Sequence, residues 1–177
     1  MSCVEANIIV GASIDTVWNC LNDITHTSNW VNGLVNAEII TRGRYGKGSV
    51  HVQHSRAGLL PTTTWTITAF EPRSRQVHVS QSAVLPAALT IAVNPVAQGT
   101  QIRINLDYRF LPMLGSVSHG LERLIMDKRM KQVLKQNLAS FSTYLMYYFL
   151  SNQRAGKPAA RVPMRRSTGI AAQAAIG

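Results

Sequence analysis

The sequence predicts one α+β domain, in which a curved antiparallel sheet of about seven strands wraps around a long C-terminal helix. Two observations carry this prediction. Segments between residues 35 and 110 alternate apolar and polar side chains with the period of a strand. From about residue 116 to residue 150, apolar side chains recur at the 3- and 4-residue steps of a helix instead. A chain of 177 residues is also long enough to bury a sizeable core.

The N-terminal elements are expected to be a short strand and two short helices. Val4 to Val10 favours a strand, and Ser13 can then cap a helix that carries Asp15 in its first turn. The apolar face of this helix is formed by Val17, Trp18, Leu21 and Ile24. A second short helical turn is expected between His26 and Trp30.

Six further strands are expected, at about residues 35–42, 49–55, 63–71, 76–82, 87–94 and 100–110. The last is the clearest, because Ile102, Ile104, Leu106, Tyr108 and Phe110 alternate with polar residues. The same alternation predicts that one apolar face also includes Trp65, Ile67, Ala69, Val77 and Val79, with His78 and Ser80 on the other face. Such a face must be covered.

The helix between about residues 116 and 150 can supply the cover. Its apolar positions at helical spacing are Leu121, Leu124, Ile125, Val133, Leu134, Leu138, Phe141, Leu145 and Tyr148. Basic residues lie mostly on its other faces, which we interpret as facing solvent, with an acidic partner as the alternative.

Charge divides the chain at about residue 150. Residues 1–150 carry 13 Lys and Arg against 8 acids, and residues 151–177 carry 5 basic residues and no acid, so each part contributes +5 to the net charge of +10. The second part lacks apolar periodicity, and we expect a domain over residues 1–150 followed by a disordered basic tail over residues 151–177.

Several classes of protein are not supported. No apolar run suits a bilayer span, and Glu5 precedes any basic residue, which is the wrong order for a secretory signal, so a cytoplasmic location is expected. Cys3 and Cys20 lack CxxC spacing, and HExxH, P-loop, GxGxxG and GxSxG motifs do not occur. We therefore expect no metal and no cofactor.

Short signatures stand at several places along the chain. The first is Ala12-Ser13-Ile14-Asp15-Thr16-Val17-Trp18, followed by Leu21, Asp23 and Trp30, and later come Gly46 and Gly48, Phe70-Glu71-Pro72, and Gly99-Thr100. Together with the order of elements, they resemble the polyketide cyclase/dehydrase group of the START-like (SRPBCC) superfamily, over about Val4 to Leu150. The resemblance implies a helix-grip fold with an internal cavity for a small hydrophobic molecule, such as a polyketide, an aromatic compound or a lipid.

The superfamily includes both carriers and enzymes, so the resemblance leaves catalysis open. An enzyme of this group would be a cyclase/dehydratase-like lyase or isomerase that works without a cofactor. The scarcity of inward polar groups in the expected sheet favours binding. The competing hypothesis is a basic protein that binds nucleic acid or another acidic partner. Nucleic acid is disfavoured because the strands lack an exposed aromatic platform, and a homodimer stays open.

Two residues are candidates for catalysis. His54 shares one face of its strand with Val50 and Val52, whereas His51 and Gln53 lie on the other, so His54 is the preferred titratable group. Tyr108 lies on the apolar face of the last strand and could donate a hydrogen bond to a ligand carbonyl. A hydrogen-bonded histidine at the sheet rim and a packing tyrosine are the structural alternatives.

The remaining candidates would bind the ligand. Trp30 and Trp65 offer flat apolar surface, Arg56 could hold a carboxylate or phenolate at the pocket mouth, and His119 could border the entrance. Core filling, solvent exposure and an ordinary connection are the respective alternatives. Apolar lining is expected from Val52, Ile67, Ile104, Leu106 and Leu134.

Overall fold

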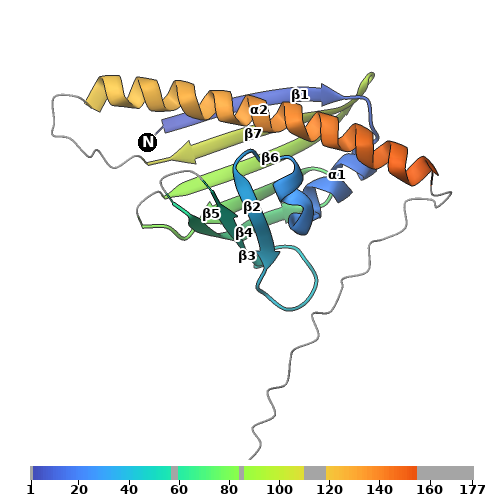
Figure 1. Ribbon diagram of the computed structural model, residues 1–177, viewed down its shortest axis with the longest axis horizontal. Helices are drawn as coiled ribbons and strands as arrows, with labels where there is room; N and C mark the ends of the chain where they lie inside the picture. The colour runs from blue at the N-terminus through green and yellow to red at the C-terminus, as the bar shows by residue number, and fades with distance from the viewer. Residues whose placement is uncertain (1, 57–59, 84–85, 110–118, 155–177) are drawn as a thin grey trace, which may run out of the picture.

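The computed structural model describes residues 2–56, 60–83, 86–109 and 119–154 (Figure 1). The strands are β1 (Ser2–Val10), β2 (Leu34–Ile39), β3 (Val50–Ser55), β4 (Thr62–Glu71), β5 (Arg75–Ser80), β6 (Ala87–Val96) and β7 (Gly99–Tyr108). The helices are α1 (Ile14–Asn22), the 3-10 helix η1 (Ile24–Asn29) and α2 (His119–Arg154). The predicted element order is confirmed.

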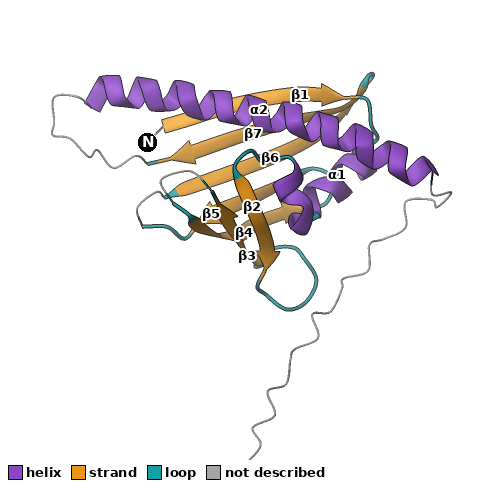
Figure 2. Ribbon diagram, viewed as in Figure 1, coloured by secondary structure: helices purple, strands orange, loops and turns teal. Residues whose placement is uncertain are grey.

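All seven strands belong to one antiparallel sheet, with the order β1-β7-β6-β5-β4-β3-β2. The two edge strands of the sheet, β1 and β2, are the first two strands of the chain, and α1 and η1 connect them. The helices α1 and α2 both contribute to the core on one face of the sheet, which we call the inner face (Figure 2). This is the helix-grip fold that the resemblance implied.

The first helix begins where the sequence places it. The Ser13 side chain accepts a hydrogen bond from the backbone N–H of Thr16 at 3.3 Å, and Asp15 lies in the first turn near the positive end of the helix dipole. The helix ends at Asn22, and the carboxylate of the next residue, Asp23, contacts the His26 ring at 2.7 Å. The chain thus turns directly from α1 into η1.

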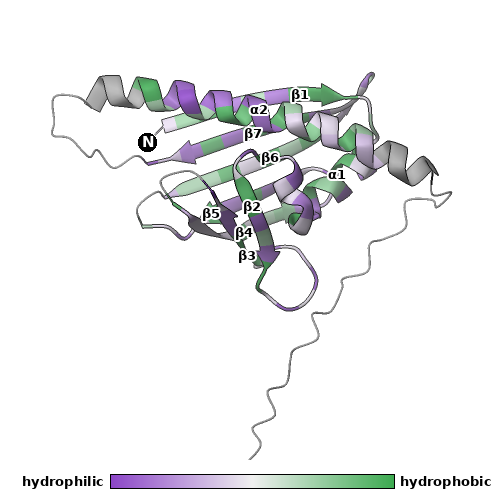
Figure 3. Ribbon diagram, in the orientation of Figure 1, coloured by the Kyte–Doolittle hydropathy of each residue, from purple (hydrophilic) through white to green (hydrophobic). Residues whose placement is uncertain are grey.

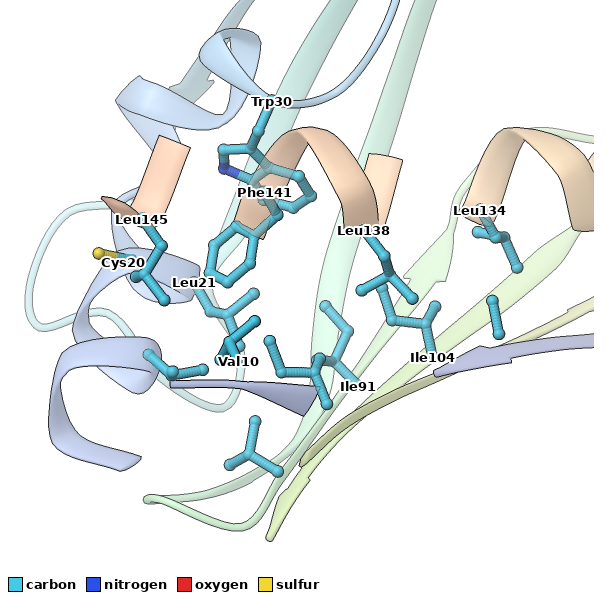
Figure 4. Packing of buried hydrophobic residues seen from close by; sticks show 14 of the residues in the cluster. Val10, Cys20, Leu21, Trp30, Ile91, Ile104, Leu134, Leu138, Phe141 and Leu145 are labelled. Carbon is cyan, nitrogen blue, oxygen red and sulfur yellow. The ribbon is translucent and has the colours of Figure 1, made fainter. Parts of the chain in front are cut away.

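One face of α2 closes the core. Leu134, Leu138, Phe141 and Leu145 follow one another at 4-, 3- and 4-residue steps and are all buried. They point toward the sheet, where Ile104 lies below the helix, and Trp30 packs edge-on against Phe141 with 5.0 Å between ring centroids (Figure 4). The predicted face is correct for these four residues, but three others assigned to it, Leu124, Ile125 and Val133, are exposed. The helix continues to Arg154, past the predicted boundary at residue 150, while the rest of the predicted tail lies outside the described residues.

At Gly99, the turn between β6 and β7 lies close against the backbone that leads from β1 into α1. Gly99 has a φ of +133°, and a Cβ atom there would lie 2.1 Å from the carbonyl oxygen of Val10. The neighbouring Thr100 hydroxyl donates to the carbonyl of Ala12 at 2.8 Å. Only glycine permits this approach, because any side chain would displace the end of β1.

The inner face is not uniformly apolar, contrary to the prediction. In β5, Gln76, His78 and Ser80 are buried, whereas Val77 and Val79 are only half-buried on the opposite face. A register shift between Ile67 and Ala69 also takes Ala69 out of the alternation that begins at Trp65. Valine favours extended backbone on either face of a sheet, so its alternation did not identify the core side.

We expect Leu138→Ala to lower the free energy of unfolding by about 2 to 5 kcal/mol, because a fully buried leucine loses its contacts and leaves a cavity. The control is Lys135→Ala, three residues away on the exposed side of α2. Urea denaturation of both variants measures the difference. Equal destabilisation would contradict the assignment of the buried face.

Candidate functional site: a polar cluster on the inner face

Four polar side chains from three neighbouring strands meet on the inner face of the sheet. The pairing register places His51 of β3 opposite Trp65 of β4, and His78 of β5 opposite Ile67 of β4. Gln76 precedes His78 by two residues and so lies on the same face. We call His51, Trp65, Gln76 and His78 the polar cluster. His51 and His78 stand edge to face, with ring centroids 5.2 Å apart.

These side chains are buried without hydrogen-bond partners. The exposed fraction is 1% for His51, 0% for Gln76 and 4% for His78, and Trp65 is half-buried. Within the described part of the chain, no group bonds to His51 Nδ1, Trp65 Nε1, Gln76 Oε1, Gln76 Nε2 or His78 Nε2. A buried polar atom without a partner costs about 1 to 3 kcal/mol, and native proteins hold few of them. Nine such atoms occur in the described part of the chain, and five of them lie together on these three adjacent strands; the others belong to Asn22, Thr27, Trp30 and Tyr45.

Burial keeps both histidines uncharged. Loss of solvent lowers the pKa of His51 to about 4, and it lowers the pKa of His78 to about 3 with a further contribution from His51. At neutral pH each ring therefore has one N–H donor and one acceptor nitrogen. Trp65 adds a donor, and Gln76 adds a donor and an acceptor. The polar cluster can bind carbonyl and hydroxyl oxygens without any formal charge.

The inner face becomes apolar on the side away from the polar cluster. His78 pairs with Leu89 of β6, Leu89 pairs with Leu106 of β7, and Leu106 pairs with Val4 of β1. Helix α2 packs mainly on the β1 side of this surface. The interior therefore has a polar end on β3, β4 and β5, and an apolar end on β6, β7 and β1. A molecule with an apolar body and an oxygen at one end matches this arrangement.

The predicted inward placement of His54 is wrong. Its side chain is 42% exposed, and its ring contacts Thr62 Oγ1 at 3.1 Å and Glu38 Oε1 at 3.7 Å. Val52 shares that outer face by alternation. Arg56 is exposed, and its backbone N–H donates to the carbonyl of Gly33 at 2.9 Å. The residue that β3 turns inward is His51, which the sequence interpretation had assigned to the other face.

The other predicted catalytic residue, Tyr108, does lie on the inner face. It is buried, and its hydroxyl donates a hydrogen bond to Asp127 of α2 at 2.6 Å. This bond joins the last strand to the covering helix, as a packing tyrosine would. The hydroxyl is thus already bonded within the protein.

The predicted lining residues divide into two groups. Trp65 and Ile67 lie beside the polar cluster. The rest belong to the main core or pack against it, namely Trp30, Ile104, Leu106 and Leu134. His119 is the first residue of α2, but its side chain and residues 110–118 lie outside the described part. Gln76 and His78 were not predicted as site residues, because they alternate with valines that were expected to face inward. The inward position of Trp65 on the neighbouring strand β4 was the one sequence signal that pointed to this part of the sheet.

Two further properties bear on the class of site. Across the residues that the structure describes, no three His, Cys, Asp or Glu side chains gather in a way that could hold a metal ion. Over the same residues, no helix combines the length and the apolar composition that crossing a bilayer requires.

The low pKa values predict a pH dependence of stability. An unfolded histidine titrates near 6.5, so between pH 6.5 and 4 the unfolded chain binds protons that the folded chain excludes. Stability should be complete above pH 7 and should fall toward pH 4, with a slope of up to about 1.4 kcal/mol per pH unit for each histidine. Urea denaturation between pH 4.5 and 7.5 measures the slope. The slope of stability against pH should flatten in the double variant His51→Gln/His78→Gln. In the control His54→Gln it should stay near the wild-type value. An unchanged slope in the double variant would contradict the burial of the two histidines.

The comparisons with known proteins agree with this fold. A family model described as polyketide cyclase/dehydrase and lipid transport matches residues 1–146. No curated protein shows a significant match to the chain.

Solved structures of similar shape are numerous. One from Thermus thermophilus has a TM-score of 0.68 and 15% identity, covering 83% of this chain and 99% of its own. A Staphylococcus aureus protein of unknown function has a TM-score of 0.69 and 8% identity, covering 84% and 96%. A conserved protein from Geobacillus kaustophilus has a TM-score of 0.63 and 12% identity, covering 82% and 96%. At these identities the similarity shows the fold alone, whereas the family model covers most of the chain. The protein therefore belongs to the polyketide cyclase/dehydrase and lipid transport family.

Proposed function

We propose that this protein binds a small, largely apolar molecule whose carbonyl or hydroxyl oxygens contact the polar cluster. The single observation that carries the proposal is the set of five buried polar atoms without partners on β3, β4 and β5. A bound oxygen would replace the hydrogen bonds that these atoms lose on leaving water. The family supports a hydrophobic ligand in general, and the polar cluster adds the requirement for a polar end.

The ligand's polar end should be uncharged. All four residues of the polar cluster are neutral near pH 7, since burial lowers the pKa of both histidines. A carboxylate at this place would lose its hydration without gaining a cation, which is unfavourable in a buried site. Ketones, phenols, alcohols and neutral esters therefore fit better than fatty-acid anions. Polyketides, aromatic compounds and lipid-like molecules all include members with such groups.

Binding or carriage is favoured over catalysis. A histidine whose conjugate acid has a pKa of about 4 or below is a weak general base at neutral pH. The Tyr108 hydroxyl, the other proposed proton donor, is bonded to Asp127. A cyclase or dehydratase could still use N–H groups of His51 and His78 to polarise a carbonyl while the site holds the chain folded. In this proposal binding comes first, and a cyclase or dehydratase reaction would follow on the bound ligand.

The other predictions made from the sequence accompany this proposal. They are a cytoplasmic location, the absence of a cofactor, and weak affinity for nucleic acid. A homodimer is compatible with them.

Gln76 offers a test that separates function from structure. Leucine has a similar size and no polar atoms, so Gln76→Leu should raise the free energy of unfolding of the ligand-free protein by about 1 to 3 kcal/mol. The same change should weaken binding of an oxygen-bearing ligand. Urea denaturation and titration with the same protein preparations measure both effects. A glutamine that served the fold would give the opposite result, with lower stability in the variant.

A pair of probes tests the polar end directly. We expect a planar aromatic ketone to quench tryptophan fluorescence and to bind more tightly than the hydrocarbon of the same shape, by about 2- to 12-fold for one neutral hydrogen bond. Trp65→Phe with Gln76→Leu should remove that preference, whereas His54→Gln should keep it. Equal affinity of the wild-type protein for both probes would contradict the role of the polar cluster, and binding of neither would contradict the proposed function.

A further inference from the structure

The exposed side of α2 carries a second pattern, made of residues that are not part of the polar cluster. We call this side the outer face of α2. Leu124, Lys128, Lys131 and Lys135 follow one another at 4-, 3- and 4-residue steps, which places them along one line of the helix. All four are exposed, although their line lies only about 80° around the helix from the buried line of Leu134, Leu138, Phe141 and Leu145. Ile125 and Arg129 are exposed farther around the helix, away from the buried line.

The positive charge of the outer face is not compensated. No ion pair among the described residues involves Lys128, Arg129, Lys131 or Lys135, although other basic residues pair with acids elsewhere on the surface. The only acid between residues 124 and 148 is Asp127. It is half-buried on the side of α2 that faces the sheet and accepts the hydrogen bond from Tyr108. Lys131 lies one turn after Asp127, whereas Lys128, Arg129 and Lys135 have no acid three or four residues away and are free to meet an anionic surface.

Large apolar side chains flank these charges at both ends. Leu124 and Ile125 are 60% and 59% exposed, and Met146 and Tyr147 are 66% and 69% exposed. Figure 3 shows green and purple segments next to one another along α2. From residue 124 to residue 147 the helix extends about 35 Å. Exposed apolar residues of this size on a charged helix indicate an interaction surface, since water solvates them poorly.

We propose that the outer face of α2 binds the surface of an anionic lipid bilayer. Such a surface accommodates both features, because lysine and arginine contact lipid phosphates and carboxylates while apolar side chains enter the boundary between headgroups and acyl chains. A nucleic acid would match the charges but would leave the four apolar side chains in water. The proposal does not depend on the ligand of the polar cluster, because it rests on exposed side chains of α2.

The docked orientation has a consequence for the proposed function. The helix would lie along the bilayer with its buried line toward the sheet, so the domain would sit on the membrane surface. Small apolar molecules concentrate in bilayers. A protein in this position could exchange such a molecule with the membrane.

Vesicle co-sedimentation of the full chain tests the docking at physiological salt. We expect binding to vesicles of phosphatidylcholine with about one third phosphatidylserine, and little binding to pure phosphatidylcholine. Each basic residue near an anionic surface contributes roughly fivefold to partitioning. The quadruple variant K128Q/R129Q/K131Q/K135Q should therefore bind anionic vesicles about 100-fold less or weaker still. L124S/I125S should also weaken binding while leaving the thermal melting temperature nearly unchanged.

The matched control is R42Q/R44Q/K47Q/R56Q, which removes the same charge from exposed residues outside α2. The five basic residues after residue 152 stay in every variant, so their contribution is common to all. The control should retain most of the vesicle binding. Equal losses in both quadruple variants would overturn the proposal, as would no binding to anionic vesicles or tighter binding to duplex DNA that displaces the vesicles.

Discussion

The packing of α2 on the β1 side of the inner face is the interaction on which the rest of this structure depends. Leu138 and Phe141 are almost fully buried there, against strands whose inward residues are aliphatic. Burial of such side chains is the main source of stability in a domain of this size. Because one helix cannot cover a seven-stranded sheet evenly, the packing divides the inner face into a part that the helix covers closely and a part that it does not.

The second part is where the polar cluster lies, and the division explains how the protein tolerates it. Five unpartnered polar atoms would cost about 5 kcal/mol or more, a large fraction of the stability of an ordinary domain. The aliphatic half of the interior supplies enough burial to offset that cost. Functional sites commonly keep groups that lower the stability of the fold, and here such groups lie together at one end of the interior. The hydrogen bond between Tyr108 and Asp127 belongs to the stable part, where it joins β7 to α2.

The helix α2 has two faces with different chemistry, and the fold dictates only one of them. Its buried line must be aliphatic to pack on the sheet, which leaves the outer face free to vary. On that face, uncompensated lysines lie between exposed apolar residues, a combination that solubility alone does not require. The same helix therefore closes the interior and presents a surface toward a partner.

The sequence by itself determined the order of elements, the family and the part of the buried line of α2 from Leu134 onward, because these depend on local patterns. It did not show that Leu124, Ile125 and Val133 would be exposed, because that depends on how far the sheet extends under the helix. Helical spacing in α2 places Leu134, Leu138, Phe141 and Leu145 on one side whatever they pack against. The facing of β3 and β5 is different, since each strand has only two valines and they favour extended backbone on either face. Pairing with β4 decided it: His51 lies opposite Trp65, and His78 lies opposite Ile67. Side-chain direction in a strand depends on the register with its neighbours, so only the tertiary structure could turn these histidines inward and leave His54 on the surface.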